Sequence, residues 1–167
     1  RYVDDKDIAI YQLTGDAKGR ILPNKKVKDQ LSSFTPQKKL EDDIKTFYDI
    51  VENVEVYNKN KNTKSLYDLS AIGLLYYWGD TIGLTKMGRE YARRVDDIDF
   101  KKKFCELAKR PYKINKAVEI IKDKNIKNIT EFKAESKELV ENINSKEYKK
   151  ASYGKIYNWA KFIIENS

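Results

Sequence analysis

The stretch NSKEYKKASYGKIYNWAKFII, residues 144–164, decides the fold class because it has the pattern of one long helix. At 100° per residue, its first turns place three lysines and Tyr153 on one stripe, which the last turns continue with apolar side chains. The lysines are Lys146, Lys149 and Lys150, and the apolar residues are Ile156, Ala160, Ile163 and Ile164. We expect the C-terminal half to be anchored in a core and the N-terminal half to face outward. An ordinary Lys-rich surface helix is the alternative, and these residues alone do not separate the two.

Charge is distributed unevenly along the 167 residues, which carry a formal net charge of +8. Residues 1–100 contain 17 basic and 17 acidic side chains, whereas residues 101–167 contain 17 basic and 9 acidic ones. A segregated positive field attracts polyanions, nucleic acid first and an anionic membrane surface second. A compositional drift toward Lys would act on the whole chain and does not explain why one part holds all the net charge. The sequence therefore favours polyanion binding.

Cysteine and histidine usage excludes several classes of site. Cys105 is the single cysteine, so the chain can form no internal disulfide and no cysteine-based zinc site, and we expect a buried thiol. The absence of histidine removes His-based acid–base catalysis and His-rich metal sites. We therefore expect no cofactor and no metal. The chain shows no signal peptide and no 18-residue apolar run, which predicts a soluble, cytoplasmic protein with no membrane partner.

Periodicity and capping signals predict a mainly α-helical protein with a few short strands. Residues 7–13 alternate as in a strand, and they fall in an N-terminal, strand-containing extension, residues 1–34. Thr35-Pro36 predicts the start of the next helix. Thr63 can cap a helix that either ends before a wing strand near Tyr76 or continues through Trp78. Residues 81–84 form a predicted strand, after which Thr85 caps a helix over residues 86–94.

The remaining residues predict a second helical unit. An amphipathic helix is expected over residues 100–108, and Pro111 separates it from a helix over residues 113–124. Thr130 is expected to cap a third helix that runs as far as Ile143, before the C-terminal helix. The chain is thus divided into a winged-helix domain, residues 35–98, and a second helix-turn-helix-type domain, residues 99–167. Large aromatic side chains at helical spacing are expected in the core: Phe47, Trp78, Phe104 and Trp159.

Two stretches resemble the end of a winged-helix domain. Leu84-Thr85-Lys86-Met87-Gly88-Arg89 fits the family's L-T-x-x-G-R pattern, and Gly73-Leu74-Leu75 matches its preceding A-x-x-L-G-L turn imperfectly. Over residues 36–165 the order of elements is similar to DNA-recognition portions of type II restriction endonucleases and to tandem winged-helix proteins encoded beside restriction systems. In these, Ser152, Tyr153, Asn158 and Trp159 would match positions of the recognition helix. The resemblance implies tandem winged-helix units that bind DNA through the helices near residues 63–78 and 146–161.

Two candidate DNA-binding surfaces combine Lys with Asn, Ser and Tyr, which can contact phosphates or base edges. The first is Lys59, Asn60, Lys61, Asn62, Lys64, Ser65 and Tyr67, and the second is Lys146, Lys149, Lys150, Ser152, Tyr153, Lys155 and Asn158. A solvated loop explains the first set equally well. The second set is favoured because charge, aromatic side chains and an apolar anchor coincide there.

The sequence predicts sequence-specific binding of double-stranded DNA. The most specific form of this hypothesis is the recognition domain of a type II restriction endonuclease with cleavage supplied elsewhere. The motifs Glu131-Phe132-Lys133 and Glu135-Ser136-Lys137 match half of a metal-dependent nuclease site, but both lie in a helical pattern. We therefore assign no catalytic residue, and whether the chain belongs to an enzyme stays open. A winged-helix transcriptional regulator and a protein-interaction or RNA-binding module are the alternatives, and the target sequence and oligomeric state are left open.

Overall fold

The structure is a computed structural model that describes residues 34–53, 61–78 and 81–167. Within these ranges the protein is mainly helical with a short β-hairpin, which confirms the predicted class. The elements are α3 (Leu40–Asn53), α4 (Thr63–Ala71), β1 (Leu75–Trp78), β2 (Thr81–Leu84), α5 (Lys86–Ala92), α6 (Phe100–Ala108), α7 (Tyr112–Asp123), α8 (Ile129–Glu135), the 3-10 helix η1 (Lys137–Val140) and α9 (Lys146–Glu165). Residues 1–33 of the predicted 1–34 extension, Lys59, Asn60 and the side chain of Trp78 lie outside the described residues.

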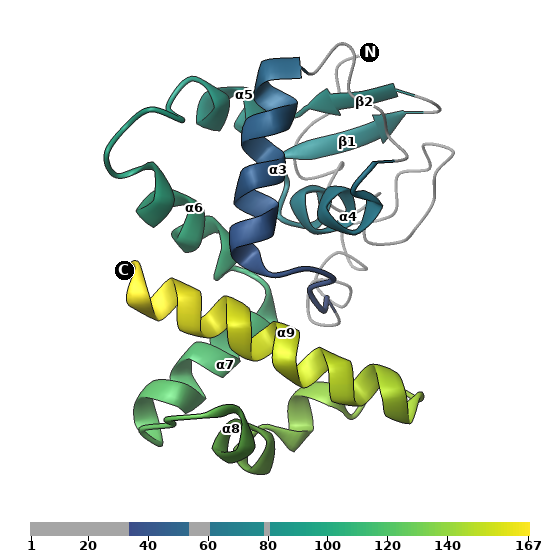
Figure 1. The fold of residues 1–167 in the computed structure, drawn as a ribbon, viewed down its shortest axis with the longest axis vertical. Helices are drawn as coiled ribbons and strands as arrows, with labels where there is room; N and C mark the ends of the chain where they lie inside the picture. The colour runs from purple at the N-terminus through teal and green to yellow at the C-terminus, as the bar shows by residue number, and fades with distance from the viewer. Residues whose placement is uncertain (1–33, 54–60, 79–80) are drawn as a thin grey trace.

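Helix α9 lies across the molecule, with α3 to α6 on one side and α7 and α8 on the other (Figure 1). The Ser145 hydroxyl accepts the Tyr148 N–H and caps its start. Its buried side chains repeat at helical spacing: Ser152, Ile156, Trp159, Ala160 and Ile163. The long C-terminal helix and its apolar anchor are therefore confirmed. The buried stripe passes through Ser152, so Tyr153 lies at its edge and is half-buried.

Helix α6 shares an aromatic core with α3 and also contacts α9. The Phe47 ring of α3 lies 6.2 Å from the Phe100 ring and 5.9 Å from the Phe104 ring. Phe47, Phe104 and Trp159 are fully buried, as their spacing predicts, and Cys105 is a buried free thiol. Helix α6 also packs against α9. A helix assigned by its sequence to the second unit therefore shares side-chain packing with the first.

Three predicted helix starts differ from the structure. Helix α3 begins at Leu40 instead of near Thr35, since the Asp68 carboxylate accepts the N–H groups of Gln37 and Lys38 before it. Helix α4 includes Thr63 and follows Asn62, whose φ of 56° places it in the left-handed region. Asn128, not Thr130, caps α8 by accepting the Glu131 N–H.

The predicted third helix of the second unit is interrupted. Helix α8 ends at Glu135, and η1 follows over Lys137–Val140. The Ser136 hydroxyl donates to the Phe132 carbonyl oxygen at the break. The Glu131 carboxylate accepts the Lys127 N–H at the start of α8, so this side chain serves as a helix cap.

The β1–β2 hairpin follows directly after α4. The strands are antiparallel, with Leu75 opposite Leu84 and Trp78 opposite Thr81. A helix through Trp78 is therefore wrong, because α4 ends at Ala71 and Gly73 turns the chain with a φ of +91°. The predicted strand over residues 81–84 and the Thr85 cap of α5 are confirmed.

Thr85 and Gly88 give a physical reason for the L-T-x-x-G pattern. The Thr85 hydroxyl accepts the Gly88 N–H at 2.9 Å and donates to the Gly73 carbonyl oxygen at 2.5 Å. A Cβ added at Gly88 would lie 2.1 Å from the Leu74 carbonyl oxygen. The glycine therefore allows the start of α5 to approach the backbone that leads into β1.

None of the helices in the three described ranges combines the length and the apolar character that crossing a lipid bilayer requires.

A pair of glycine substitutions tests this packing. Gly88→Ala should lower the free energy of unfolding by about 2 kcal/mol or more, because the methyl group meets backbone that cannot move independently. Gly154→Ala is the matched control, since no heavy atom lies within 4 Å of its added Cβ in α9. It should stabilise the protein by about 0.5–1 kcal/mol. Urea unfolding measures both, and a Gly88→Ala variant as stable as the unmodified protein would contradict the close approach.

Candidate nucleic-acid interface

The cationic half of α9 is held beside residues 34–40, here named the 34–40 segment. The Trp159 indole N–H donates to the Lys38 carbonyl oxygen at 2.8 Å. The Leu40 N–H donates to the Asn158 side-chain oxygen at 3.1 Å, and the Tyr148 hydroxyl donates to the Gln37 side-chain oxygen at 2.9 Å. The segment therefore follows α9 from its first turns to its centre.

Two other helices hold the same segment. The Asp68 carboxylate of α4 accepts the Gln37 N–H at 2.8 Å and the Lys38 N–H at 2.9 Å. The buried Lys113 ammonium of α7 donates to the Thr35 hydroxyl at 2.9 Å. Burial lowers the pKa of Lys113. Because three helices fix the segment, its lysines are placed at a constant position relative to α9.

A buried pair of carboxyl groups lies under the 34–40 segment. Asp43 of α3 and Asp68 of α4 are both fully buried. Burial, followed by the charge of Asp68, raises the pKa of Asp43 above its ordinary value of 3.8. Burial also raises the pKa of Asp68, although its bonds from Gln37 and Lys38 favour the ionised form. Asp43 is therefore the carboxyl that holds the proton of the pair.

The first predicted surface is reduced to the start of α4. Lys61, Asn62 and Lys64 are exposed, and Lys61 lies 3.9 Å from the Asp49 carboxylate. Ser65 is buried, so its hydroxyl cannot reach a duplex in this structure. Most of the other α4 side chains are buried as well, and the helix does not present a free face along its length.

Tyr67 brings the first predicted surface close to the second. Its ring is half-buried and stacks on Phe34 with the ring centroids 5.9 Å apart. Burial, with smaller contributions from the charges of Asp68 and Tyr148, raises the pKa of Tyr67 to about 12. Tyr148 is in the first turn of α9. The two predicted surfaces therefore meet where α4 and α9 flank the 34–40 segment.

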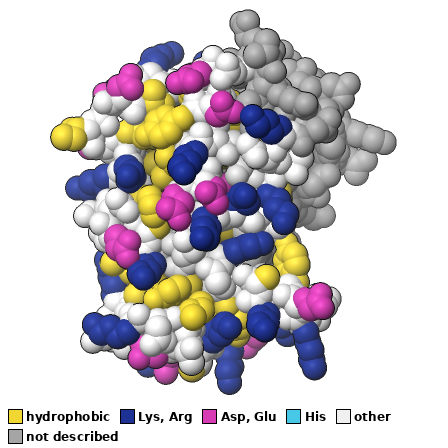
Figure 2. Space-filling view, viewed as in Figure 1, with side chains coloured by type: hydrophobic (Ala, Val, Ile, Leu, Met, Phe, Trp, Pro, Cys, Tyr) yellow, Lys and Arg dark blue, Asp and Glu magenta, His cyan; other side chains and the backbone are white. Residues whose placement is uncertain are grey.

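The side chains of the second predicted surface differ in exposure. Lys146 and Lys150 are exposed, and Lys149, Tyr153 and Lys155 are half-buried. Ser152 is buried and donates to the Tyr148 carbonyl oxygen at 2.6 Å, and the Asn158 side-chain oxygen accepts the Leu40 N–H. Ser152 is therefore unavailable to a duplex, which corrects its assignment, and the Asn158 side-chain oxygen serves an internal contact. Figure 2 shows Lys and Arg side chains around this half of α9.

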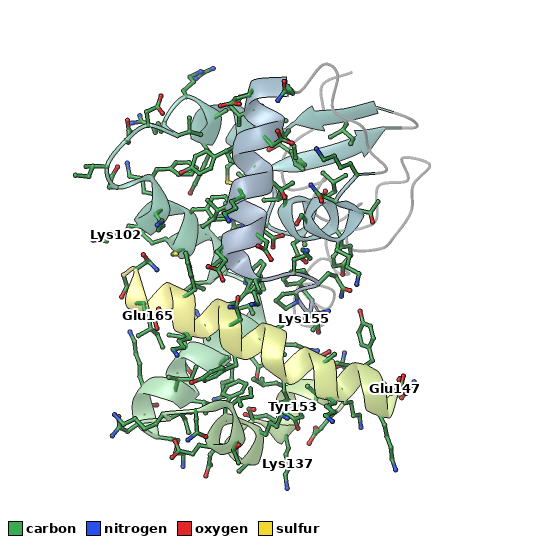
Figure 3. All side chains as sticks on the ribbon, in the orientation of Figure 1. Lys102, Lys137, Glu147, Tyr153, Lys155 and Glu165 are labelled. Atoms are coloured by element: carbon green, nitrogen blue, oxygen red, sulfur yellow. The ribbon has the colours of Figure 1, made fainter. Side chains whose placement is uncertain are left out.

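The remaining side chains of this half of α9 do not share one stripe. Figure 3 shows Lys155 on the side of α9 near the start of α3 and Tyr153 on the opposite side, with Glu147 at the helix tip. Lys150 and Lys155 are about 140° apart around the helix. A duplex that contacts both lysines would therefore lie across the outer surface of α9, not along the predicted stripe.

Sequence reasoning missed three residues beside these lysines. Lys39 is exposed, Lys38 is half-buried, and both belong to the 34–40 segment. Their proximity to α9 depends on contacts over more than 100 residues of sequence, as the 121-residue separation of Lys38 and Trp159 shows, and no local pattern predicts it. Tyr148 could have been found, because it is seven residues before Lys155 and therefore on the same helix face.

No family model, no curated protein and no solved structure matches this chain. Within the described residues, no group of three or more Asp, Glu or Cys side chains could hold a metal ion. A functional inference therefore depends on the surface that these residues form.

The buried carboxyl pair gives the protein a pH-dependent stability. The folded state keeps the Asp43 proton at pH values where the unfolded chain releases it, so stability falls as pH rises above 3.8. Asp43→Asn removes this loss, because the amide has no proton to release in this pH range. Its stabilising effect should grow by up to about 1.4 kcal/mol per pH unit above pH 4. Urea unfolding at a series of pH values between 4 and 8 measures the difference.

Asp42→Asn is the control for this experiment, because it removes a neighbouring carboxyl group that is not buried. It should not reproduce the pH-dependent gain. A constant difference between Asp43→Asn and the unmodified protein over this pH range would show that Asp43 is ionised in the folded state.

Proposed function

We propose that the chain binds double-stranded DNA through the N-terminal half of α9 and the adjoining 34–40 segment. The observation that carries the proposal is a group of lysines without acidic partners on a firmly held helix. Lys146, Lys149 and Lys150 form no ion pair within the part of the chain that the structure describes, where Lys61, Lys103, Lys116 and Lys161 do. Their ammonium groups are available to phosphates, which supply most of the affinity for DNA.

We assign phosphate contacts to three further lysines of the surface. Lys155 and Lys38 are half-buried on the flank of α9 and in the 34–40 segment, and Lys39 is exposed beside them. Contacts from these side chains to phosphates would fix the position of a duplex without reading its sequence. Sequence specificity, which is part of the proposal, then requires base contacts from the exposed side chains of α9 or from the first turn of α4.

The tandem winged-helix architecture also belongs to this proposal. The order α4, β1, β2 and α5 is the order that the resemblance predicts for a recognition helix, a wing and the following helix. Since most of α4 is buried, we assign the main DNA contact to α9 and an accessory contact to Lys64 at the start of α4. A recognition domain of a type II restriction endonuclease is the most specific form of the proposal, and a winged-helix regulator would use the same surface.

Charge reversal on α9 tests the DNA surface. Lys146→Glu with Lys150→Glu should weaken binding to a labelled duplex by at least about tenfold at low salt, because two phosphate contacts become repulsive. Fluorescence anisotropy measures the affinity. Thermal unfolding should change little, since both side chains are exposed.

Lys124→Glu with Lys127→Glu is the matched control. It makes the same change in net charge just beyond the end of α7. The end of α7 lies near the C-terminal end of α9, because Lys122 of α7 and Ile163 of α9 line the same pocket. Ile163 follows Lys146 by seventeen positions along α9, which is about 26 Å of helix. Equal losses in the two double variants would indicate a general effect of charge, and an unchanged affinity of the Lys146 and Lys150 variant would exclude this surface.

Selection of duplexes from a random pool tests specificity separately. Bound duplexes that share a motif would support sequence-specific recognition. Equal enrichment of unrelated duplexes would limit the function to nonspecific binding, and preferential binding of an RNA competitor would contradict the DNA proposal.

A further inference from the structure

A pocket of about 230 Å³ lies between α6, α7 and the C-terminal end of α9. Val118, Ile163 and Ile164 give it an apolar lining. Lys102, Lys109 and Lys122 also line it, and Glu106 is the acidic side chain among its described lining residues. We name it the lysine-lined pocket. Its composition suits an apolar group that carries negative charge around it.

The connection between α5 and α6 presents a group of this kind. Ile98 is completely exposed, with a relative accessibility of 104%. Asp96, Asp97 and Asp99 flank it and are exposed. Asp97 and Asp99 form ion pairs: a carboxylate oxygen of Asp97 lies 3.6 Å from an Arg94 guanidinium nitrogen, and one of Asp99 lies 3.3 Å from the Lys103 ammonium nitrogen. All four side chains are exposed. Such pairs contribute little energy and can exchange partners readily.

The exposed Ile98 and the lysine-lined pocket belong to one face of the molecule. Lys102, Cys105, Glu106 and Lys109 all line the pocket, and their spacing places them on one face of α6. Ile98 comes two residues before Phe100, where α6 begins, and four residues before Lys102 of the pocket. Figure 1 shows the α5–α6 connection, α6 and the C-terminal end of α9 on the same side of the molecule.

We propose that this face binds a second copy of the chain, with the two α6 helices antiparallel about a twofold axis. Ile98 of each copy then enters the lysine-lined pocket of the other, and the aspartates beside it face Lys102, Lys109 and Lys122. An isologous contact of this type is self-complementary and closes as a dimer. A single exposed Ile is common in soluble proteins. Here the same surface also contains a pocket of matching polarity and opposite charge, and this complementarity identifies the partner as the chain itself.

Sedimentation velocity of the full chain tests the proposal. The unmodified protein should change from monomer to dimer as its concentration rises from about 1 to about 100 µM. Ile98→Asp should raise the dimer dissociation constant by at least about tenfold, because the apolar insertion is lost from both contacts. The thermal unfolding of the monomer, measured at about 1 µM, should be unchanged, since Ile98 is fully exposed among the described residues. A monomer throughout this range, or a dimer unaffected by Ile98→Asp, would overturn the proposal.

A charge exchange provides the specific control. Asp96→Lys with Asp97→Lys should weaken the dimer, and so should Lys109→Glu with Lys122→Glu. The four substitutions combined should restore it, because the lysines and carboxylates then change places. The Lys146→Glu, Lys150→Glu variant should dimerise normally, which separates this proposal from DNA binding. A monomer that binds decanoate until Lys109→Glu and Lys122→Glu are introduced would assign the pocket to a small amphipathic anion and refute the dimer.

Discussion

The bonds to the 34–40 segment are the constraint on which the rest of the structure depends. Asp68 accepts two consecutive N–H groups from one side of this segment, and Asn158 and Trp159 bond its backbone from the other. Because these groups are buried or half-buried, each would lose a partner if the segment moved. Together these hydrogen bonds fix the start of α3, the position of α4 and the centre of α9 relative to one another. It thereby holds the cationic turns of α9 in place while its apolar turns fill the core.

Local patterns predicted those elements whose boundaries are set by nearby residues. The C-terminal helix, the helix over Phe100–Ala108, the strand over Thr81–Leu84 and the Thr85 cap all depend on periodicity or on groups a few residues apart. The start of α3 could not be predicted in the same way. Thr35 has the composition of a helix cap, but its hydroxyl accepts a bond from Lys113, which is 78 residues away.

In the candidate site, too, local sequence predicts some features, and contacts between distant residues decide the others. The exposure of Lys146 and Lys150 follows from their helical positions. Ser152 and Asn158 have suitable groups for DNA contacts, but their hydrogen bonds are made to the Tyr148 carbonyl oxygen and the Leu40 N–H. The sequence gives the chemistry of a side chain, and long-range packing decides whether that side chain is available. Lys38 and Lys39 join the surface for the same reason.

The two proposed contacts occupy opposite ends of α9. The lysines for DNA are in its first turns, and Ile163 and Ile164 of the lysine-lined pocket are in its last. A dimer formed through α6 would therefore leave both cationic ends accessible and present two DNA surfaces related by a twofold axis. Duplex binding by such a dimer would favour sites with matching symmetry.

The dependence of DNA affinity on salt concentration tests the central claim most directly. If Lys146, Lys149, Lys150 and Lys155 each neutralise a phosphate, the slope of log K against log salt concentration should be about −3 to −4 for the unmodified protein. Substitution of Lys146 and Lys150 should make the slope shallower by about 2. A slope near zero, or one that these substitutions leave unchanged, would contradict the account.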